Sequence, residues 1–409
     1  MANYKNITAR DKNIPRTTVL HLTADLEPDD LSREAVDAAV LTQRNGWRAL
    51  MVSAGGRYVN EVERAAVRHR NLSVGSKSLL TRLMCSMRLD TIVQQERPAL
   101  IHVHGMDALS CGIALAHKKR LPLILSLCQP VAPTKANRNL FKRLSKALFA
   151  LRVPSRFMAV HLHDTFGLDA SAINIIPPGV DLNVHSAGFI SPERLHALNQ
   201  LWRLPEQAAV LLMPMPLADQ GGHSILLEAL SLLRGEKIYA IMAGSDRANP
   251  GYRAQVEAEI VRRGLDGRVI MPEECSDLPA ACWMASVIVA PNEAPRGVNL
   301  SVLAAQAVGR PVIVTRTGAH EEFVRQNETA WIIDTGDAKQ LANAIREAIH
   351  LPTDIRLATA DTAHNFIAEN FPQSAYYNGM RELYDYLLHR EPATASPHPQ
   401  KTQQAQAAA

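Results

Sequence analysis

The chain has little of what marks secreted, membrane-spanning or nucleic-acid-binding proteins. Its 409 residues include five cysteines, an odd number at irregular spacing, which is typical of reduced thiols rather than of a disulfide framework. No stretch approaches the roughly 18 consecutive apolar residues of a membrane span. The net charge of +4 is small for this length and gives no argument for a nucleic acid partner. These features lead us to expect a cytoplasmic globular protein.

The sequence also lacks a set of metal ligands and a glycine-rich phosphate loop. Cys275 and Cys282 are too isolated to indicate a zinc site, so no metal and no cofactor are expected. After the first apolar run the chain reads "TADLEPDDLSREA", with Asp29 and Asp30 where glycines would favour a phosphate. Acids stabilise a helix N-terminus, so we expect this pair to cap a helix that starts near Ser32.

What the chain does have is an alternation of short apolar runs with amphipathic helical patterns. The runs of the first half are 17–22, 48–54, 99–105 and 122–128. The pattern restarts near residue 205, with runs at 208–214, 237–244, 267–272, 285–291, 311–315 and 330–334. Buried parallel strands read as continuous apolar runs, and strands that alternate with helices indicate a doubly wound α/β fold.

We therefore predict two Rossmann-like domains that face each other across a cleft and are joined near 177–195. The expected boundaries are a flexible start (1–16), the first domain (17–180), the second domain (181–372), a C-terminal helix that packs back on the first domain (373–390) and a disordered tail (391–409). The tail, "EPATASPHPQKTQQAQAAA" in its full extent, is polar and of low complexity.

Two histidines end one of the predicted strands. His102 and His104 point to the same face, because side chains alternate along a strand, and the carboxyl end of a strand borders the cleft. One of them could donate a hydrogen bond or transfer a proton there. Two interpretations stay open, a catalytic His104 and a pair of structural histidines.

The stretch 137–152, "NRNLFKRLSKALFALR", has the spacing of a basic amphipathic helix. Its apolar stripe consists of Leu140, Leu144, Leu148 and Leu151, and its cations are Arg138, Lys142, Arg143, Lys146 and Arg152. Such a helix can lie on an anionic membrane surface. The alternative is that the stripe packs on the domain core while the cations are solvated.

Several separated blocks resemble the retaining glycosyltransferases of glycosyltransferase family 4, which have the two-domain GT-B fold. In the second half these are "INIIPPGVDL" (173–182), "HSILLEALSLL" (223–233) and the long block from 264 to 324 that contains "NEAPRGVNLSVLAAQAVGRPVIVT". In the first half "VSAGGRYVNEVERAAVRH" and "SKSLLTRL" resemble the branch found in bacterial surface-polysaccharide and lipopolysaccharide-core synthesis. The resemblance covers about 17–388 and implies an acceptor domain followed by a nucleotide-sugar donor domain.

The resemblance also shows which family residues are replaced. The family holds the donor diphosphate with an Arg and a Lys, and places two glutamates, separated by seven residues, at the sugar and the ribose. It also has a Gly-Gly loop and a His in the first domain. The matching positions here are Pro216 and Gly221 for the cations, Arg296 and Ala304 for the glutamates, Asp29 and Asp30 for the glycines, and Cys128 for the histidine.

The remaining matched positions define the candidate site. The resemblance implies a catalytic role for His104 and donor binding by Gly297, Asn299, Leu300 and Glu322. A helix that starts at Leu300 could offer backbone N–H groups to an anion. Arg296 could take over part of the lost positive charge, because a guanidinium forks onto phosphate; a solvated loop residue is the alternative.

Two functions follow from this pattern. The first is transfer of a hexose from a nucleotide-diphosphate sugar to a glycan or lipid-linked acceptor, at a peripheral position on the inner membrane face. The second is a catalytically inactive relative that binds a glycan or partners an active homologous glycosyltransferase. Losing two cations and a ribose carboxylate would cost on the order of 4–8 kcal/mol of donor binding if each charged hydrogen bond contributed independently.

Overall fold

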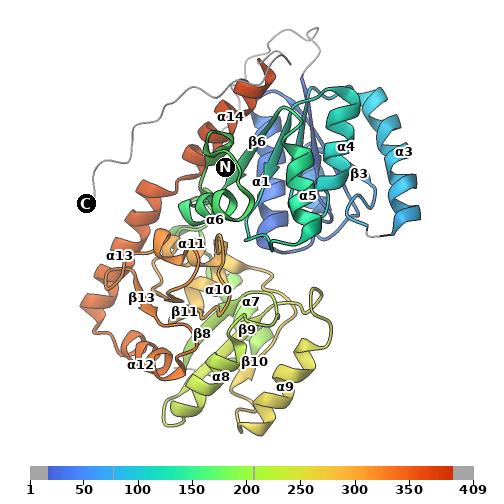
Figure 1. The fold of residues 1–409 in the computed structure, drawn as a ribbon. Helices are drawn as coiled ribbons and strands as arrows, with labels where there is room; N and C mark the ends of the chain where they lie inside the picture. The colour runs from blue at the N-terminus through green and yellow to red at the C-terminus, as the bar shows by residue number, and fades with distance from the viewer. Residues whose placement is uncertain (1–16, 77, 206–207, 390–409) are drawn as a thin grey trace.

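Two parallel sheets form the cores of two stacked domains (Figure 1). The structure is a computed structural model that describes residues 17–76, 78–205 and 208–389. The first sheet has seven strands in the order β3-β2-β1-β4-β5-β6-β7, and the second has six in the order β10-β9-β8-β11-β12-β13. Every strand pair is parallel and helices join the strands. The predicted α/β class with two doubly wound domains is confirmed.

The elements follow one another in alternating order within each half. Those of the first half are β1 (Thr18–Leu22), α1 (Asp30–Arg44), β2 (Arg48–Ser53), α2 (Val59–Arg64), β3 (Arg68–Asn71), α3 (Leu79–Glu96), β4 (Leu100–His104), α4 (Leu109–Lys119), β5 (Leu123–Ser126), α5 (Lys135–Leu144), β6 (Phe149–Val153), α6 (Arg156–Phe166), η1 (Ala170–Ala172) and β7 (Ile173–Ile175).

The second half contains the other sheet and the helices that return to the first domain. Its elements are η2 (Ala187–Phe189), α7 (Pro192–Trp202), β8 (Ala209–Pro214), α8 (His223–Leu232), β9 (Ile238–Ala243), α9 (Tyr252–Arg262), β10 (Val269–Ile270), α10 (Leu278–Met284), β11 (Val287–Ala290), α11 (Leu300–Ala307), β12 (Val312–Thr315), η3 (His320–Glu322), β13 (Ala330–Ile333), α12 (Ala338–Ile349), α13 (Thr353–Asn370) and α14 (Gln373–Leu388).

The strands form where the sequence is apolar because both faces of each sheet are covered by helices. β1, β4 and β5 are buried at every residue, as expected for the centre of a parallel sheet. The three strands β3, β6 and β7 lie at or near the sheet edges and were not predicted from apolar runs. β3, "RHRN", is mostly exposed, so it carries no apolar run to detect.

The predicted amphipathic helix over 137–152 is wrong in its second half. α5 ends at Leu144, and Phe149–Val153 forms β6 between β5 and β7. Leu151 therefore lies in a buried strand rather than on a helix stripe, and Arg152 is fully buried. Tertiary pairing with β5 overrides the helical spacing. Only the first part of the proposed membrane-contact helix exists, and its Phe141 and Leu144 pack into the core of the first domain.

The chain crosses between the domains twice, and the two crossings touch. The backbone N–H of Val180 donates to the carbonyl of Phe371 at 2.8 Å. A Cβ on Gly179 would lie 2.5 Å from the Cα of Gln373, so this position requires glycine. Beyond the crossing, α14 packs on the first sheet, where its Tyr384 joins a core cluster with Val19 and other strand residues. The expectations for 1–16 and 391–409 lie outside the described residues.

None of the described helices combines the length and the apolar character that crossing a bilayer requires.

Candidate functional site between the two domains

The loops at the carboxyl ends of the two sheets meet between the domains. The strand order reverses between β1 and β4 in the first sheet and between β8 and β11 in the second, which is where doubly wound sheets bind ligands. The loop after β11 leads into α11, and the hydroxyl of Ser301 in its first turn donates to the carbonyl of Pro214 at the end of β8, at 3.0 Å. The structure therefore gathers the matched positions of the second domain at one edge of its sheet.

The turn at Gly297 is pressed against the first domain. Its N–H donates to the side-chain oxygen of Gln129 at 3.3 Å, and its carbonyl accepts from the hydroxyl of Ser155 at 3.0 Å. A Cβ here would lie 2.4 Å from the carbonyl oxygen of Cys128, so only glycine fits. Asn299 caps α11 by accepting from the N–H of Ser301 at 3.1 Å, as the sequence indicates for a helix starting at Leu300.

Asp30 of the first domain faces Arg296 of the second. Burial raises the pKa of Asp30 to about 6, while the charge of Arg296 and the backbone N–H of Leu300 favour its ionised form. The resemblance expects a glycine at Asp30 and a glutamate at Arg296, whereas the structure has the acid on the first domain and the cation on the second. An internal carboxylate thus lies at the helix N-terminus that is predicted to meet a donor anion.

Asp29 and Asp30 also begin α1, as predicted, although the helix starts two residues earlier than Ser32. The carboxylate of Asp29 accepts from the N–H of Ser32 at 2.6 Å. The capping interpretation of the pair is confirmed for Asp29, and Asp30 has the additional contact across the domain boundary.

The loop after β8 holds Pro216 and Gly221. The N–H of Gly221 donates to the carbonyl of Ala218 at 3.1 Å, and a Cβ on Gly221 would lie 2.8 Å from the ring of His223. Burial and, to a smaller extent, the charge of Arg296 together lower the pKa of His223 to about 4. His223 is fully buried and neither ring nitrogen has a partner among the described residues. This loop, where the resemblance expects two cations, is therefore close enough to Arg296 for the charge of Arg296 to act on His223.

A buried ion pair lies beneath the junction in the first domain. Arg152 of β6 pairs with Glu34 of α1, and the thiol of Cys128 donates to the same carboxylate. Burial raises the pKa of the Cys128 thiol, and the neighbouring Glu34 raises it further, so this thiol stays protonated. The Arg152 guanidinium also donates to the carbonyl of Ile176 at 2.8 Å and lies 5.3 Å from the ring centre of Tyr376.

His104 lies inside a group of three histidines rather than on an open surface. The parallel register places His21 of β1 beside His102 of β4, and His102 and His104 share a face of the sheet as predicted, their ring centroids 4.0 Å apart. All three rings are at most 1% exposed. His104 does not line the cavity described below, and its catalytic role stays a prediction.

The hydrogen bonds assign the protons of this cluster. The hydroxyl of Thr42 donates to the carbonyl of Ala38 at 2.8 Å, so it accepts from Nε2 of His21 at 3.0 Å. Nδ1 of His21 must then accept from Nε2 of His104 at 3.2 Å. Nδ1 of His104 is left unprotonated, buried and without a partner among the described residues. Burial lowers the pKa of His104 well below its ordinary value, which keeps the ring neutral.

The sequence shows no cluster of possible metal ligands, but the structure brings three histidines together. His21, His102 and His104 each offer a nitrogen within 4.8 Å of the others. The sequence did not show this cluster, because His21 comes next to His102 only through the pairing of β1 with β4. Tyr384 and Ser126 occupy both nitrogens of His102, at 2.7 and 2.8 Å, so a hydrogen-bonded network already uses most of the lone pairs. We keep the expectation of no metal.

Glu322 is engaged at the domain boundary. Its carboxylate accepts from the backbone N–H groups of Arg156 and Phe157 at 2.7 and 2.8 Å, which are the first residues of α6. A carboxylate at a helix N-terminus is stabilising. In this arrangement both oxygens have partners in the first domain, and donor binding by Glu322 stays a prediction.

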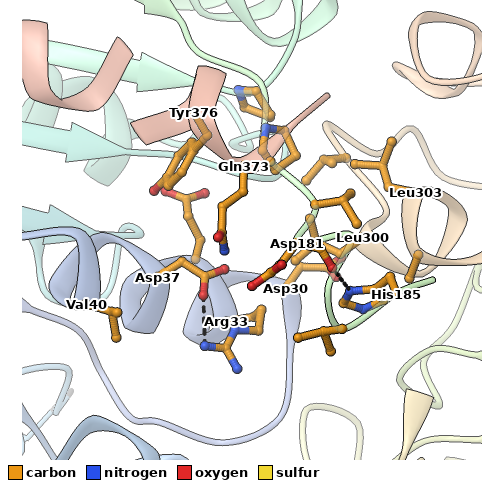
Figure 2. Close-up of a pocket in the computed structure, with 18 of the residues that line it drawn as sticks. Asp30, Arg33, Asp37, Val40, Asp181, His185, Leu300, Leu303, Gln373 and Tyr376 are labelled. Atoms are coloured by element: carbon orange, nitrogen blue, oxygen red, sulfur yellow. Dashed lines mark hydrogen bonds and ion pairs between the residues drawn. The ribbon is translucent and has the colours of Figure 1, made fainter. Parts of the chain in front are cut away.

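A cavity of about 300 Å³ opens between the domains beside these positions (Figure 2). Three of the matched positions line it, namely Asp30, Cys128 and Ala304, together with Leu300 of α11. The other walls come from the face of α1, the crossing segment around Gly179 and the start of α14. Ala304, which the resemblance matches to the ribose glutamate, therefore borders an interdomain space.

Two family models match the chain in the same order as its two domains. The model described as "Glycosyltransferase Family 4" matches residues 32–184, and the one described as "Glycosyl transferases group 1" matches residues 208–350. The chain belongs to the glycosyltransferases.

Relatives and solved structures agree with this assignment. A D-inositol 3-phosphate glycosyltransferase of Nocardioides sp. is 29% identical over 209 residues, which are 47% of this chain and 44% of that protein. One of Rhodococcus erythropolis is 24% identical over 350 residues, 78% of this chain and 77% of that protein. The match to the Nocardioides protein thus spans less than half of its length.

The structure of Anabaena Alr3699/HepE in complex with UDP-glucose superposes with a TM-score of 0.81 at 19% identity, and covers 91% of this chain and 100% of that chain. At this level of identity the likeness shows the fold alone, which is the GT-B arrangement of two Rossmann-like domains.

Several residues of the site were missed by the sequence reading. Glu34 is the fifth residue of α1 and Tyr376 the fourth residue of α14, and neither stands in a recognisable motif. Arg152 left a signal, because one guanidinium inside the apolar run "FALRV" needs a buried partner. The helical interpretation of 137–152 hid that signal.

Proposed function

We propose that this glycosyltransferase moves a hexose from a nucleotide-diphosphate sugar to a glycan or lipid-linked acceptor, with retention of configuration, in cell-surface polysaccharide or lipopolysaccharide synthesis. Membership of the family supports sugar transfer, and the Anabaena structure contains UDP-glucose. The observation that carries the proposal is the junction of the α11 N-terminus, Arg296 and the loop after β8 at the switch point of the second sheet.

Arg296 is the residue that we propose to meet the donor diphosphate. Its guanidinium has no hydrogen bond or ion pair within the described ranges, although Asp30, His223 and His320 all feel its charge. A guanidinium can fork onto phosphate oxygens and stabilise the charge that develops on a leaving diphosphate. The N–H groups at the start of α11 would act in the same direction once Asp30 moves away.

Asp30 must leave the α11 N-terminus before a phosphate can bind there, because two anions at short range repel each other. We propose that separation of the domains withdraws it, since Asp30 and Leu300 stand on different domains. His104 would act as a hydrogen-bond acceptor through Nδ1, the nitrogen that the network leaves unprotonated.

The second candidate is a catalytically inactive protein that binds a glycan or an active homologous glycosyltransferase. The observation that favours it is the position of Asp30 at the N-terminus of α11. It is supported by Pro216 and Gly221, which stand where the resemblance expects two cations. The fold needs none of the lost polar groups, since function sits on a scaffold that survives without it.

Calorimetric titration with UDP-, GDP- and ADP-linked sugars separates the two candidates. The proposal predicts submillimolar binding of at least one donor and a loss of about ten- to a hundredfold in affinity for Arg296→Ala, the contribution of one charged hydrogen bond. Arg316→Ala is the matched control, because that exposed side chain pairs with Glu321 outside the junction. Absence of binding by every donor would contradict the transfer proposal and favour the inactive relative.

Restoring family residues gives a second test of the same question. Ala304 borders the cavity and Pro216 lies in a partly exposed loop, so each larger side chain has a space to extend into. Gly221→Lys needs the His223 ring to shift. If Pro216→Arg, Gly221→Lys, Arg296→Glu and Ala304→Glu together create transfer activity absent from the parent, the parent is the inactive relative.

We also propose that the remaining basic helix, α5, contacts the inner membrane face, where Lys142 and Arg143 of its last turn are exposed. Sedimentation with vesicles of anionic and of neutral lipids tests it. Equal binding to both kinds of vesicle, or to neither, overturns this part of the proposal.

A further inference from the structure

The outer side of α3 is apolar although it is exposed to solvent. Leu80, Met84 and Met87, which we call the α3 stripe, follow one another at helical spacing and are 70%, 50% and 66% exposed. The opposite side of α3 packs into the core of the first domain through Cys85 and Leu89. A helix that covers a sheet normally turns polar residues to the solvent, so a second apolar side indicates a further partner.

The positive charge of the chain is concentrated around this stripe. Residues 68–146 contain fourteen Lys or Arg and three Asp or Glu, a surplus of eleven positive charges. Because the whole chain carries +4, the rest of the chain has a surplus of seven negative charges. A charge separation of this size draws an anionic surface to one part of the molecule.

Three neighbouring helices carry these cations on one side of the first domain (Figure 1). Lys118 of α4 pairs with Asp90 of α3, and the ring of His117 in α4 donates to the carbonyl of Arg143 in α5 at 3.2 Å. The side chains of Arg88 in α3 and Arg143 in α5 are exposed, and no acid within the described ranges forms an ion pair with them. The α3 stripe is therefore accompanied by cations that lack an acidic partner.

We propose that the α3 stripe and the cations around it bind the surface of a lipid bilayer that contains anionic lipids. Apolar side chains enter the boundary between headgroups and acyl chains, while neighbouring Lys and Arg side chains stay at the headgroups. A soluble polyanion offers charge but no hydrocarbon for exposed Leu and Met side chains, so the combination favours a bilayer. The inference rests on the membrane contact proposed above and assigns the insertion into the bilayer to α3 rather than to α5.

The position of α3 also sets which edge of the first domain meets the bilayer. β3 ends at Asn71 and α3 begins at Leu79, so the first turns of α3 lie near the carboxyl edge of the parallel sheet. Leu80 and Met84 stand in these turns, on the side of the first domain that is turned toward the second domain (Figure 1). A bilayer bound by the stripe lies beside the interdomain junction rather than at the far end of the first domain.

Sedimentation of the full chain with vesicles of phosphatidylglycerol and phosphatidylcholine tests the contribution of the stripe. We expect the triple variant Leu80→Gln, Met84→Gln, Met87→Gln to bind about tenfold more weakly than the parent or worse, because three apolar side chains no longer enter the boundary. Val261→Gln is the matched control, since Val261 is 64% exposed on α9 of the second domain. Equal melting temperatures of the variants and the parent show that the fold is kept.

Fluorescence quenching measures whether the stripe enters the bilayer. With the parent's signal subtracted, the fluorescence of Met87→Trp should be quenched by phosphatidylcholine brominated on its acyl chains, in vesicles that also contain phosphatidylglycerol. The fluorescence of Val261→Trp, at a position of nearly the same exposure, should not change.

Three results would overturn the proposal. The first is equal vesicle binding by the triple variant and by Val261→Gln. The second is unquenched fluorescence of Met87→Trp on bound vesicles. The third is association of the parent with dextran sulfate, or with a second copy of the chain, and not with anionic vesicles.

The double variant Lys142→Ala, Arg143→Ala separates this inference from the proposed contact of α5. If the double variant binds vesicles like the parent and the triple variant does not, the contact of α5 is wrong and the assignment to α3 stands. The reverse pattern contradicts the assignment to α3 alone. Titration with nucleotide sugars is independent of both, so sugar transfer is tested separately.

Discussion

At the scale of single residues, the burial of Asp30 at the domain boundary makes stability depend on pH. The folded-state pKa of Asp30, about 6, lies above the ordinary value of 3.8, so the folded chain disfavours the ionised form. Below about pH 4 the carboxyl group is protonated in folded and unfolded chains and costs nothing. As the pH rises through 6, the folded chain must ionise this acid and stability is lost.

Asp30→Asn removes the ionisation while keeping the size. We expect the variant to unfold at higher temperature than the parent at pH 7.5, by at most about 3 kcal/mol in free energy, because one pKa unit corresponds to about 1.36 kcal/mol. The gap should close as the pH falls below 5. Thermal unfolding of both proteins across pH 4–8 measures it, and a gap that is the same at pH 5 and pH 7.5 contradicts the assignment.

Gly297 gives a second prediction at this scale. Alanine at 297 would place its Cβ against the carbonyl oxygen of Cys128 and the side chain of Met158, so the turn must move off the first domain. We expect a loss of about 1–3 kcal/mol of stability, typical of overpacking. Gly188→Ala is the control, because nothing lies within 4 Å of its added Cβ. Equal denaturation midpoints for the two variants would show that the turn is not tightly packed.

At the scale of elements, Glu322 joins η3 of one domain to the N-terminus of α6 in the other. Glu322→Ala removes the acceptor for two backbone N–H groups and should destabilise the protein by about 1–3 kcal/mol. Glu322→Gln keeps an acceptor and loses the charge, with a smaller expected loss of about 0.3–1 kcal/mol. Urea unfolding measures both.

Glu321→Ala is the matched control for this pair, since Glu321 is an exposed neighbour that pairs only with Arg316 among the described residues. Surface pairs contribute about 0–1 kcal/mol. If Glu322→Ala is no more destabilising than Glu321→Ala, the contact with α6 contributes nothing measurable.

How far the sequence could predict each element depends on where its cause lies. The starts of α1 and α11 were predicted because a cap is a local interaction, as with Asp29 and Ser32. The segment 149–153 was mistaken for helix because strand pairing with β5 is not local. The contact of His21 with His102 and His104 arises from the register between β1 and β4. Tyr376 reaches the cavity because α14 packs back on the first domain. No short motif encodes either arrangement. The second-domain candidates could be named because they stand in recognisable motifs, whereas Glu34, Arg152 and Tyr376 do not, and the roles of the named candidates stay predictions.

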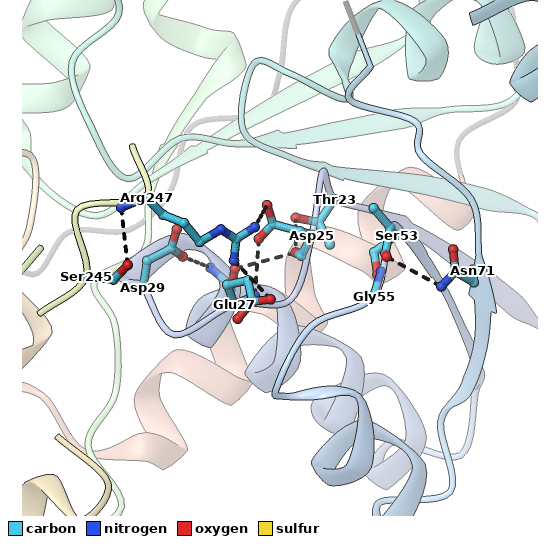
Figure 3. A network of polar contacts seen from close by, with 11 residues as sticks. Thr23, Asp25, Glu27, Asp29, Ser53, Gly55, Asn71, Ser245 and Arg247 are labelled. Atoms are coloured by element: carbon cyan, nitrogen blue, oxygen red, sulfur yellow. Dashed lines mark hydrogen bonds and ion pairs between the residues drawn. The ribbon is translucent and has the colours of Figure 1, made fainter. Parts of the chain in front are cut away.

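At the scale of the whole molecule, ion pairs bridge the two domains away from the hinge. Figure 3 shows Arg247 of the second domain reaching Asp25 and Glu27 of the first, at 3.5 and 2.9 Å. Arg57 of the first domain pairs with Glu273 and Glu274 of the second. These side chains are mostly exposed, so each pair contributes about 0–1 kcal/mol to closure.

The association of the two domains should therefore become weaker as the salt concentration rises. The Debye length falls from about 10 Å at 0.1 M to about 3 Å at 1 M. Weakening these pairs by about 2 kcal/mol in all would change the ratio of joined to separated domains by about thirtyfold. We expect Arg247→Glu to raise the radius of gyration in small-angle scattering at low salt, and Arg234→Glu, which lies beyond α8, to leave it unchanged. If the radius of gyration is the same for both variants and at both salt concentrations, the interdomain ion pairs do not hold the domains together.

The central claim is that the junction of α11, Arg296 and the loop after β8 receives a nucleotide-linked sugar. Hydrogen–deuterium exchange of the full chain, with and without UDP-, GDP- and ADP-linked sugars, tests it most directly. The account predicts that at least one donor protects the amides of 293–301 and 216–223 while Arg296→Ala removes that protection. No change in exchange with any donor, or protection confined to other segments, would contradict it.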